Sequence, residues 1–360
     1  MSSASTTPRW ALLVPLAGGA CLAAGFFLHL SGPFIALMVA VLMGAVIAAV
    51  HHAEVIAERV GEPFGTLVLA LAVTVIEASL IVSLTLTGGP QAEDLARDTL
   101  FSAVMIVCNG VVGLCLLVGG IRHGEQEFRI ESASSSLGVL VALATLTLVI
   151  PVYTTSSPGP TFSVPQLIFA GVASLVLYAS FVFVQTVRHR EYFLAPGAAT
   201  ETAAHERPPL ATAVTSAVLL LVCLVSVVGL AKLLSPGIEA AVISSGAPEA
   251  TVGIAIAFLV LLPEALAAVR SAYANRLQLS LNLALGSALA SIGLTIPAVV
   301  AVSVLMGIPL TLGLGAKDTV LLALTFVVST LTFFTGRTTV LQGAVHLVIF
   351  AAFLFLSLVP

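Results

Sequence analysis

Charged side chains are scarce in this sequence, which has Asp, Glu, Lys or Arg at only 8% of its 360 positions. A soluble domain carries about 25% charged residues, so a water-soluble protein of this composition would expose apolar surface and aggregate. The 13 Lys and Arg and 17 Asp and Glu form neither a basic tract nor an acidic tail. The composition therefore excludes water as the main solvent, and we expect no nucleic-acid partner.

Cysteine and aromatic residues are also few. Aromatic residues make up 6% of the chain, with a single Trp, which argues against a roomy, aromatic-lined site for organic cations. Neither a nucleophile with its base nor a pair of Asp residues lies within the apolar stretches, so we expect no enzyme activity and no cofactor. The cysteines suggest no disulfide framework or CxxC zinc motif, because all four lie within apolar stretches: Cys21, Cys108, Cys115 and Cys223.

Long apolar runs take the place of charge, since 59% of the residues are hydrophobic. A membrane-spanning helix needs about 20 mostly apolar residues. The sequence therefore predicts an all-α polytopic membrane protein with about 11 transmembrane helices. The first span is interpreted as a retained helix rather than a cleaved signal peptide. The expected spans lie near residues 10–30, 33–50, 66–87, 99–120, 137–153, 165–187, 211–234, 250–269, 277–305, 318–335 and 339–358.

The basic residues fall mainly on one side of the membrane in this arrangement. Ten of the 13 lie on the side of the N-terminus, and only Arg97, Lys232 and Lys317 lie on the other. Cytoplasmic loops carry the excess of Lys and Arg. We therefore expect a plasma (bacterial inner) membrane protein with a cytoplasmic N-terminus and an external C-terminus. The two longer connections, 121–136 and 188–210, would face the cytoplasm.

Two glutamates lie deep within expected spans, Glu77 and Glu264. A charge at the bilayer centre costs about 2.5–3.5 kcal/mol on insertion scales, so such residues are functional candidates. Glu62 precedes Glu77 by 15 residues, Glu249 precedes Glu264 by the same interval, and both outlying glutamates are next to a proline. The span of Glu77 runs outward and that of Glu264 runs inward, as in an inverted repeat. We expect this symmetry to bring Glu77 and Glu264 together near the membrane midplane.

The same symmetry predicts the domain organisation. Residues 1–33 would form an N-terminal tail and an extra helix, and residues 188–210 a cytoplasmic linker. The two inverted five-helix repeats would occupy residues 34–187 and 211–360.

The acidic pair predicts exchange chemistry. Two carboxylates close together at low dielectric cannot both stay ionised without a counter-charge, so they bind either protons or a cation. A hard cation takes oxygen ligands, and several oxygens are candidates to support the site, although packing is the commoner role of each hydroxyl alone. Glu62 and Glu249 are candidate entrance or gate residues. The supporting candidates are the hydroxyls of Thr74, Ser287, Ser291 and Thr295, the Asn109 amide, and the Leu259 carbonyl, which Pro263 leaves without a helical N–H partner.

Several motifs together resemble the ChaA-type calcium/proton antiporters, a branch of the cation/Ca²⁺ exchanger superfamily. They are HHAEVIAERVGEPFG (51–65), VIEASLI (75–81), RDTL (97–100), LPE (262–264) and TGRTTVLQGAVHL (335–347). The resemblance covers the chain from about residue 34 to the end. It implies an eleven-helix secondary active antiporter that exports Ca²⁺, or in this branch Na⁺ or K⁺, against inward proton flow. The family's two essential acidic residues fall on Glu77 and Glu264, and its Gly-Ser pair falls on Gly286-Ser287.

The chain also departs from the pattern of the superfamily, which has Asn three residues before each acidic residue. Thr74 and Leu261 occupy those positions here, and Ala290 and Leu114 replace further amide residues. With fewer neutral oxygens, a Na⁺(K⁺)/H⁺ antiporter with the same site remains the alternative to Ca²⁺/H⁺ exchange, and a cation channel is the more distant one. The expected partners are inorganic cations, protons and the lipid bilayer, and a homo-oligomer is left open. His346 is expected to be a hydrogen-bonded interior residue rather than a ligand.

Overall fold

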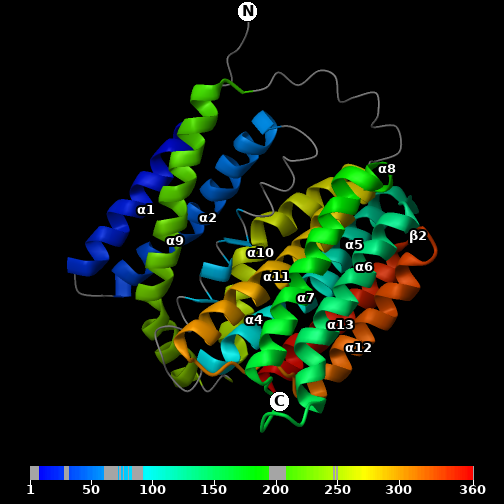
Figure 1. Cartoon of the computed structure of the whole chain (residues 1–360). Helices are drawn as coiled ribbons and strands as arrows, with labels where there is room; N and C mark the ends of the chain where they lie inside the picture. Colours follow the sequence, from blue (N-terminus) through cyan, green and yellow to red (C-terminus); the bar gives the residue numbers. More distant parts are fainter. Residues whose placement is uncertain are drawn as a thin grey trace, which may run out of the picture.

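The computed structural model describes residues 8–27, 32–60, 72, 74–75, 77–79, 81–82, 92–193, 208–245, 248 and 250–359. Helices account for almost all of this part of the chain (Figure 1). The elements are α1 (Arg9–Phe27), α2 (Gly32–Val60), α4 (Ala92–Met105), the π-turn η1 (Ile106–Val111), α5 (Val112–His123), β1 (Gln126–Glu127), α6 (Ile130–Ala144), η2 (Thr145–Val149), η3 (Ile150–Tyr153), α7 (Val164–Phe183), η4 (Val184–Arg188), α8 (Arg190–Phe193), α9 (Leu210–Ser245), α10 (Ala250–Tyr273), α11 (Leu277–Met306), α12 (Ala316–Phe333), β2 (Arg337–Thr338) and α13 (Val340–Leu358).

The expected membrane spans are largely present. Within the described residues, nine helices are long and apolar enough to cross a membrane, or ten if the two halves of the bent helix α10 count as one span. These ten coincide with ten of the eleven expected stretches. The remaining stretch, 66–87, lies mostly outside the described residues, so the count of eleven stays a prediction. The all-α, multi-pass membrane fold is confirmed.

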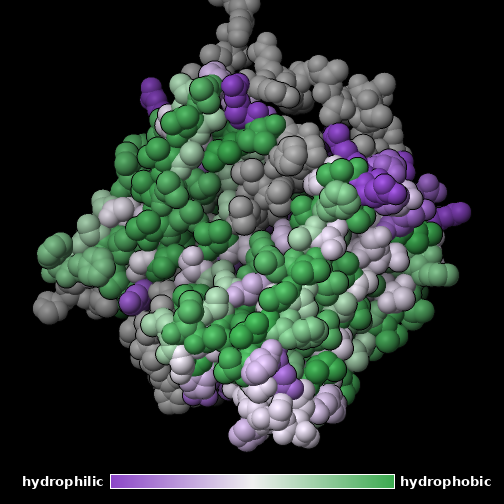
Figure 2. Space-filling view, viewed as in Figure 1, coloured by the Kyte–Doolittle hydropathy of each residue, from purple (hydrophilic) through white to green (hydrophobic). Residues whose placement is uncertain are grey.

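Apolar side chains cover the outside of the helices (Figure 2). Phe169 on α7, Leu221 on α9 and Leu331 on α12 are each more than 60% exposed. An apolar surface of this extent is unfavourable in water but matches the hydrocarbon of a bilayer. Hydrophilic side chains gather instead near one end of the molecule, in the region where Figure 1 places α8.

Helices α1, α2 and α9 pack together as a three-helix unit on one side of the molecule (Figure 1). Small residues allow the close approach. A Cβ atom added to Gly229 on α9 would come within 2.5 Å of Leu22 on α1, and one added to Gly25 would come within 2.7 Å of Leu233. Close contacts at small residues are the usual way in which helices associate in lipid. This unit has an apolar core distinct from the main core of the larger bundle, and Val260 of α10 is the residue of that bundle that joins it.

The larger bundle contains α4 to α7 and α10 to α13, and α11 lies at its centre. Helix α11 packs against α7, α10 and α6. Its buried residues occupy nearly all sides of the helix, as expected for a helix that is apolar all round. Any polar group on α11 is therefore surrounded by other helices, and this is where the candidate site lies.

The expected connection at 121–136 is shorter than the sequence predicts. Helix α5 continues to His123 and α6 already begins at Ile130. The polar residues that suggested a loop are buried within the helix, where Ser132 donates to the Asn282 side chain and Ser136 donates to the Ser132 carbonyl. The remaining loop contains β1, which pairs antiparallel with β2. In the second connection, 188–210, residues 194–207 lie outside the described part.

Candidate cation and proton site

Both predicted glutamates lie inside the larger bundle. The side chain of Glu77 is only 2% exposed, and that of Glu264 on α10 is partly exposed. The described residues around Glu77 are helical, although most of its expected span lies outside the described part. The two carboxylates are close enough to interact electrostatically. The expectation that they come together is therefore met by the geometry, while their role in transport stays a prediction.

Helix α11 connects the two carboxylates through a pair of serines. The Ser287 hydroxyl donates a hydrogen bond to Oε2 of Glu264, and the Ser291 hydroxyl donates one to Oε2 of Glu77. Residues four apart lie on the same face of a helix, with Cβ atoms about 5–6 Å apart. The two acidic groups therefore lie side by side along one turn of α11. Since Ser291 is at the middle of this helix, the pair is deep within the bundle.

Oxygen atoms without a partner lie on the same surface. Within the described chain, Oε1 of Glu77 and the Thr295 hydroxyl are buried and have no hydrogen-bond partner. Thr295 follows Ser291 by one turn and continues the predicted hydroxyl stripe. Thr74, one turn before Glu77, is buried as well, but it has an interaction partner and is not one of these unpaired groups. Buried oxygens are normally paired, so unpaired ones beside two carboxylates are suited to bind a proton or a hard cation.

Helix α10 bends where it carries the carboxylate. Its segments Gly253–Leu262 and Glu264–Tyr273 meet at 53°, and Pro263 lies at the break. A proline has no N–H to donate to the carbonyl four residues earlier, and sharp helix bends are usually found at such positions. The carbonyl four residues before Pro263 belongs to Leu259, so its part in the site stays a prediction.

Asn109 does not join the carboxylates. The structure places its amide in a separate cluster, where it donates to the Thr325 hydroxyl at 2.8 Å and contacts His346 at 3.2 Å. The expected interior, hydrogen-bonded environment of His346 is confirmed by these contacts. The candidate gate residues Glu62 and Glu249 lie outside the described residues.

One residue near the site is not among the sequence candidates. The phenol of Tyr178 on α7 lies within electrostatic reach of Glu264, and its ring packs closely against Gly293 of α11. A lone tyrosine in an apolar span carries no spacing pattern, so only the packing of α7 against α11 reveals its proximity. Among the described residues, no group of three or more His, Cys, Asp or Glu is arranged to hold a metal ion.

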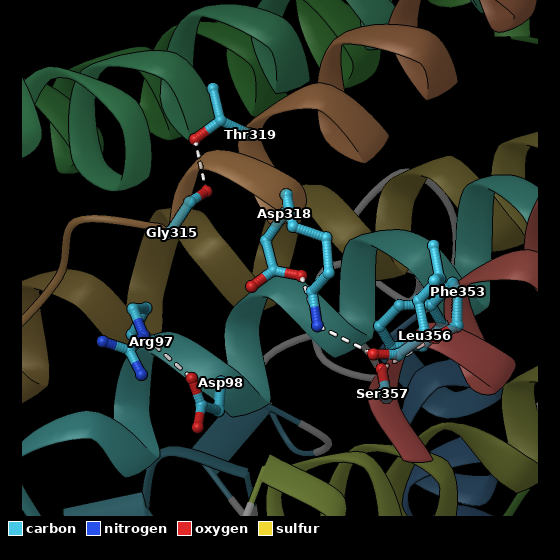
Figure 3. A network of polar contacts seen from close by, with 9 residues as sticks. Arg97, Asp98, Gly315, Asp318, Thr319, Phe353, Leu356 and Ser357 are labelled. Atoms are coloured by element: carbon cyan, nitrogen blue, oxygen red, sulfur yellow. Dashed lines mark hydrogen bonds and ion pairs between the residues drawn. The ribbon is translucent and has the colours of Figure 1, made fainter. Parts of the chain in front are cut away.

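A second charged cluster joins the N-terminal ends of α4 and α12 (Figure 3). Arg97 donates to the Asp98 carboxylate at 2.8 Å, and Lys317 donates to the Leu356 carbonyl at 2.8 Å. Asp98 and Asp318 interact electrostatically across the two helices. Asp94, which also pairs with Arg97, and Asp318 lie in the first turns of α4 and α12, where an acidic residue is favourable because it opposes the helix dipole. The cluster therefore has a structural explanation apart from Glu77 and Glu264.

Comparison with known proteins identifies the family. The sodium/calcium exchanger protein family matches residues 31–187 and 215–359, which is most of the chain. The chain belongs to this family. It is 50% identical over 98% of its length to the ionic transporter y4hA of Sinorhizobium fredii, of which the match covers 97%. It is also 36% identical over 87% of its length to the sodium-potassium/proton antiporter ChaA of Escherichia coli, with 85% of that protein covered.

The fold is that of solved exchangers. The structure of native YfkE superimposes with a TM-score of 0.72, covering 97% of this chain and 100% of that one, at 18% sequence identity. A selenium-substituted structure of the same protein describes YfkE as a Ca²⁺/H⁺ antiporter. At this level of identity the likeness establishes the shared exchanger fold. The ChaA relative at 36% identity places this exchanger in the ChaA-type branch.

Proposed function

We propose that this exchanger is a cation/proton antiporter in which a metal cation and protons compete for Glu77 and Glu264. The observation that carries the proposal is the pairing of the two carboxylates inside the bundle with Ser287 and Ser291, one helical turn apart on α11. Ligands of this kind suit hard cations, and metal binding to carboxylates requires their deprotonation. Membership of the sodium/calcium exchanger family supports the same function.

The charges of the pair explain the coupling. An empty, doubly ionised pair would place two negative charges in the membrane interior, which is costly. One divalent cation or two protons would neutralise both carboxylates. The exchanger would then change access between the two sides only when the pair is neutralised, so that cation export is linked to proton entry.

Ca²⁺ is the proposed cargo, because one divalent ion balances two carboxylates. Na⁺ or K⁺ is the second candidate, for two specific reasons. The relative at 36% identity is named a sodium-potassium/proton antiporter. In addition, the neutral oxygens on α11 come from hydroxyls, and the Asn109 amide is engaged elsewhere. Ca²⁺ usually takes six to eight oxygen ligands, so a site with few neutral oxygens is less selective for it.

The proposed cycle uses alternating access across the inner membrane. A cytoplasmic cation binds Glu77 and Glu264, the helices rearrange, and the cation leaves on the outer side. Protons then neutralise the pair and are carried inward. Glu62 on the inside and Glu249 on the outside would guide ions to the site. No enzyme chemistry and no cofactor are needed for this cycle.

Ion flux in proteoliposomes tests the cargo directly. Purified exchanger would be reconstituted with an imposed pH gradient, and uptake of radioactive Ca²⁺ or Na⁺ would be measured with and without the gradient. We expect gradient-driven uptake of at least one of the two ions and its loss in Glu264→Gln. Glu131→Gln is the matched control, because Glu131 is exposed at the start of α6 and the same chemical change is made there.

The same experiment separates the antiporter from a channel. A channel would pass the cation in the absence of a pH gradient, and Glu264→Gln would change its selectivity rather than stop the flux. Flux that is independent of the proton gradient would therefore refute the antiporter proposal.

A further inference from the structure

A pair of histidines lies within the three-helix unit, apart from the carboxylate site. His51 and His52 are adjacent on α2, toward the end of the unit that is predicted to face the cytoplasm. The His52 side chain is fully buried, and the centroids of the two imidazole rings are 5.6 Å apart. Ionisable side chains within membrane spans are costly and are functional candidates by default. The carboxylate mechanism gives this pair no role.

One side of the His52 ring has a structural task. Pro15 of α1 has no N–H to donate to the carbonyl of Ala11, four residues earlier. Nε2 of His52 lies 2.8 Å from this carbonyl oxygen and takes the place of the missing donor. Because a carbonyl oxygen only accepts, Nε2 carries the proton in the neutral ring and Nδ1 is a bare acceptor. This hydrogen bond joins α2 to the first part of α1.

The other side of the pair has no such explanation. Nδ1 of His52 and Nε2 of His51 are buried and have no hydrogen-bond partner within the described chain. Buried polar atoms are normally paired, so two unpaired ring nitrogens on neighbouring residues require a reason. The free lone pair on Nδ1 of His52 can bind a proton, and histidine is the side chain whose charge ordinarily changes between pH 5 and 8.

An imidazolium at this place would have little compensation. Glu58 lies within electrostatic reach of His51, and Arg59 donates to the Pro208 carbonyl at 3.0 Å. A buried charge without a hydrogen-bonded partner is costly, so a protonated pair would be stabilised by water that enters between α1 and α2. The charged groups of the described helices toward this end are Arg9 on α1, Glu54, Glu58 and Arg59 on α2, and Arg270 on α10, while the start of α9 has none.

The three-helix unit is in contact with the helix that carries a carboxylate. Helices α2 and α9 both pack against α10, which carries Glu264. Val260, one turn before Glu264 on the same helix, is part of the apolar core of the three-helix unit. A shift of α1 relative to α2 would therefore change the packing next to the carboxylate site.

We propose that His51 and His52 form a proton-sensing site, distinct from the transport site, whose protonation loosens α1 from α2 and slows exchange. The inference rests on the proposed cation/proton exchange, because that is the activity that the site would regulate. Neutral histidines allow α1 and α2 to pack, whereas an imidazolium at position 52 has no acceptor for its second N–H. Slower exchange at acidic pH would limit further acidification, since the proposed cycle carries protons into the cytoplasm.

The only tryptophan in the chain provides a direct readout of the pair. The ring centroid of Trp10 lies 5.1 Å from that of His51. An imidazolium quenches the fluorescence of a neighbouring indole more strongly than a neutral imidazole does, and movement of α1 would change the signal further. Intrinsic fluorescence of the purified exchanger would be titrated from pH 7.5 to pH 5. We expect a titration step in the wild type and none in the double variant His51→Gln/His52→Gln.

Glutamine is the matched replacement for these histidines. It is neutral at every pH of the titration, and its amide N–H can still donate to the Ala11 carbonyl. His189→Gln is the control, because the same chemical change is made at a histidine whose side chain is 41% exposed. We expect His189→Gln to keep the wild-type titration step.

The effect on transport is measured with the exchange of radioactive for unlabelled cation in proteoliposomes. Equal pH and saturating cation on both sides minimise the competition with protons at Glu77 and Glu264. We expect the rates of the wild type and of His189→Gln to fall about threefold between pH 7.5 and pH 5, the range in which histidine changes its charge. The double variant should lose much less of its rate.

Three results would overturn the proposal. A double variant that slows as steeply as the wild type would show that the histidines do not control the rate. Wild-type fluorescence that stays constant with pH would show that the pair binds no proton. A fluorescence step without loss of rate would show that proton binding does not regulate exchange. Should the double variant fail to fold, His51→Gln decides in the same two measurements, because His52 then keeps its bond to α1.

Failure of the wider function has a different signature. If the wild type exchanges no cation at either pH, the proposed function is refuted, and its regulation is refuted with it. The fluorescence titration still reports in that case whether the histidine pair binds a proton. If exchange is present and depends on Glu264 but the double variant behaves like the wild type, only the role of the histidines is refuted.

Discussion

Two serine residues of α11 hold the two carboxylates that we propose to bind the cation and the protons. Ser287 and Ser291 each donate to one carboxylate, so both acidic groups are held by one rigid helix. A hydroxyl donates to a carboxylate and presents its oxygen to a cation, which allows the same serine to serve both states of the site. The serines therefore align the pair for a cation without themselves carrying charge.

Competition between protons and the cation predicts a specific pH dependence. The cation binds only the deprotonated carboxylates, so acidification on the cation side raises the half-saturating cation concentration, up to about tenfold per pH unit for each proton displaced. The maximal rate at saturating cation should change much less. Initial rates of cation entry into proteoliposomes between pH 6 and pH 9, at several cation concentrations, measure both quantities. A half-saturating concentration that is constant across this range would contradict competition at the carboxylates.

The sequence predicts part of the site and misses the rest for identifiable reasons. Glu77 and Glu264 stand out because charge in an apolar span is costly, and the spacing of Ser287 and Ser291 places both on one face of any helix. Asn109 is different, because the direction of its side chain depends on the π-turn and on the packing of α13. Local spacing contains no information about either.

At the level of secondary-structure elements, long apolar runs are sufficient to predict most helices, but their ends are less certain. The start of α6 lies seven residues before the expected start of its span, because buried serines there find partners inside the bundle. The bend of α10 follows from Pro263 and is predictable from the sequence alone. The packing of the helices against one another requires the structure.

The close contact of α13 with α5 at Gly343 predicts that a larger residue at this position lowers the stability of the protein. A Cβ atom added to Gly343 on α13 would lie 2.5 Å from the backbone nitrogen of Leu117 and 2.9 Å from the Gly113 carbonyl oxygen. Backbone atoms cannot move aside easily, so Gly343→Ala should separate α13 from α5 and cost about 1–3 kcal/mol. Thermal unfolding in detergent would measure this as a lower Tm.

Gly138 on α6 is the matched control for this substitution. Nothing lies within 4 Å of a Cβ atom added there, and alanine favours helix over glycine. Gly138→Ala should therefore keep or raise the Tm. Equal Tm values for the two variants would contradict the proposed contact between α13 and α5.

For the whole molecule, the distribution of Lys and Arg predicts the orientation in the membrane. The loop after α5 would face the cytoplasm and the loop between η3 and α7 the outside. All four natural cysteines are buried, so labelling of the unmodified chain should be low. A membrane-impermeant thiol reagent added to intact cells should label Thr155→Cys and leave Glu125→Cys unmodified, since both positions are exposed. The opposite pattern would reverse the orientation.

The two-repeat organisation is a second property of the whole molecule. The family matches the chain in two segments, and Glu77 and Glu264 lie one in each. The division at residues 188–210 stays a prediction, because much of that connection lies outside the described residues. An inverted repeat would explain why two carboxylates 187 positions apart in the sequence share one site.

The most direct test of the central claim uses inside-out membrane vesicles that hold a proton gradient reported by a pH-sensitive dye. Ca²⁺, Na⁺ and K⁺ would be added one at a time to vesicles with the wild-type exchanger or with Glu77→Gln. Proton-coupled exchange predicts that at least one cation discharges the gradient in the wild type and none does so in Glu77→Gln. A wild-type gradient that survives all three cations, in protein shown to be folded, would contradict the account.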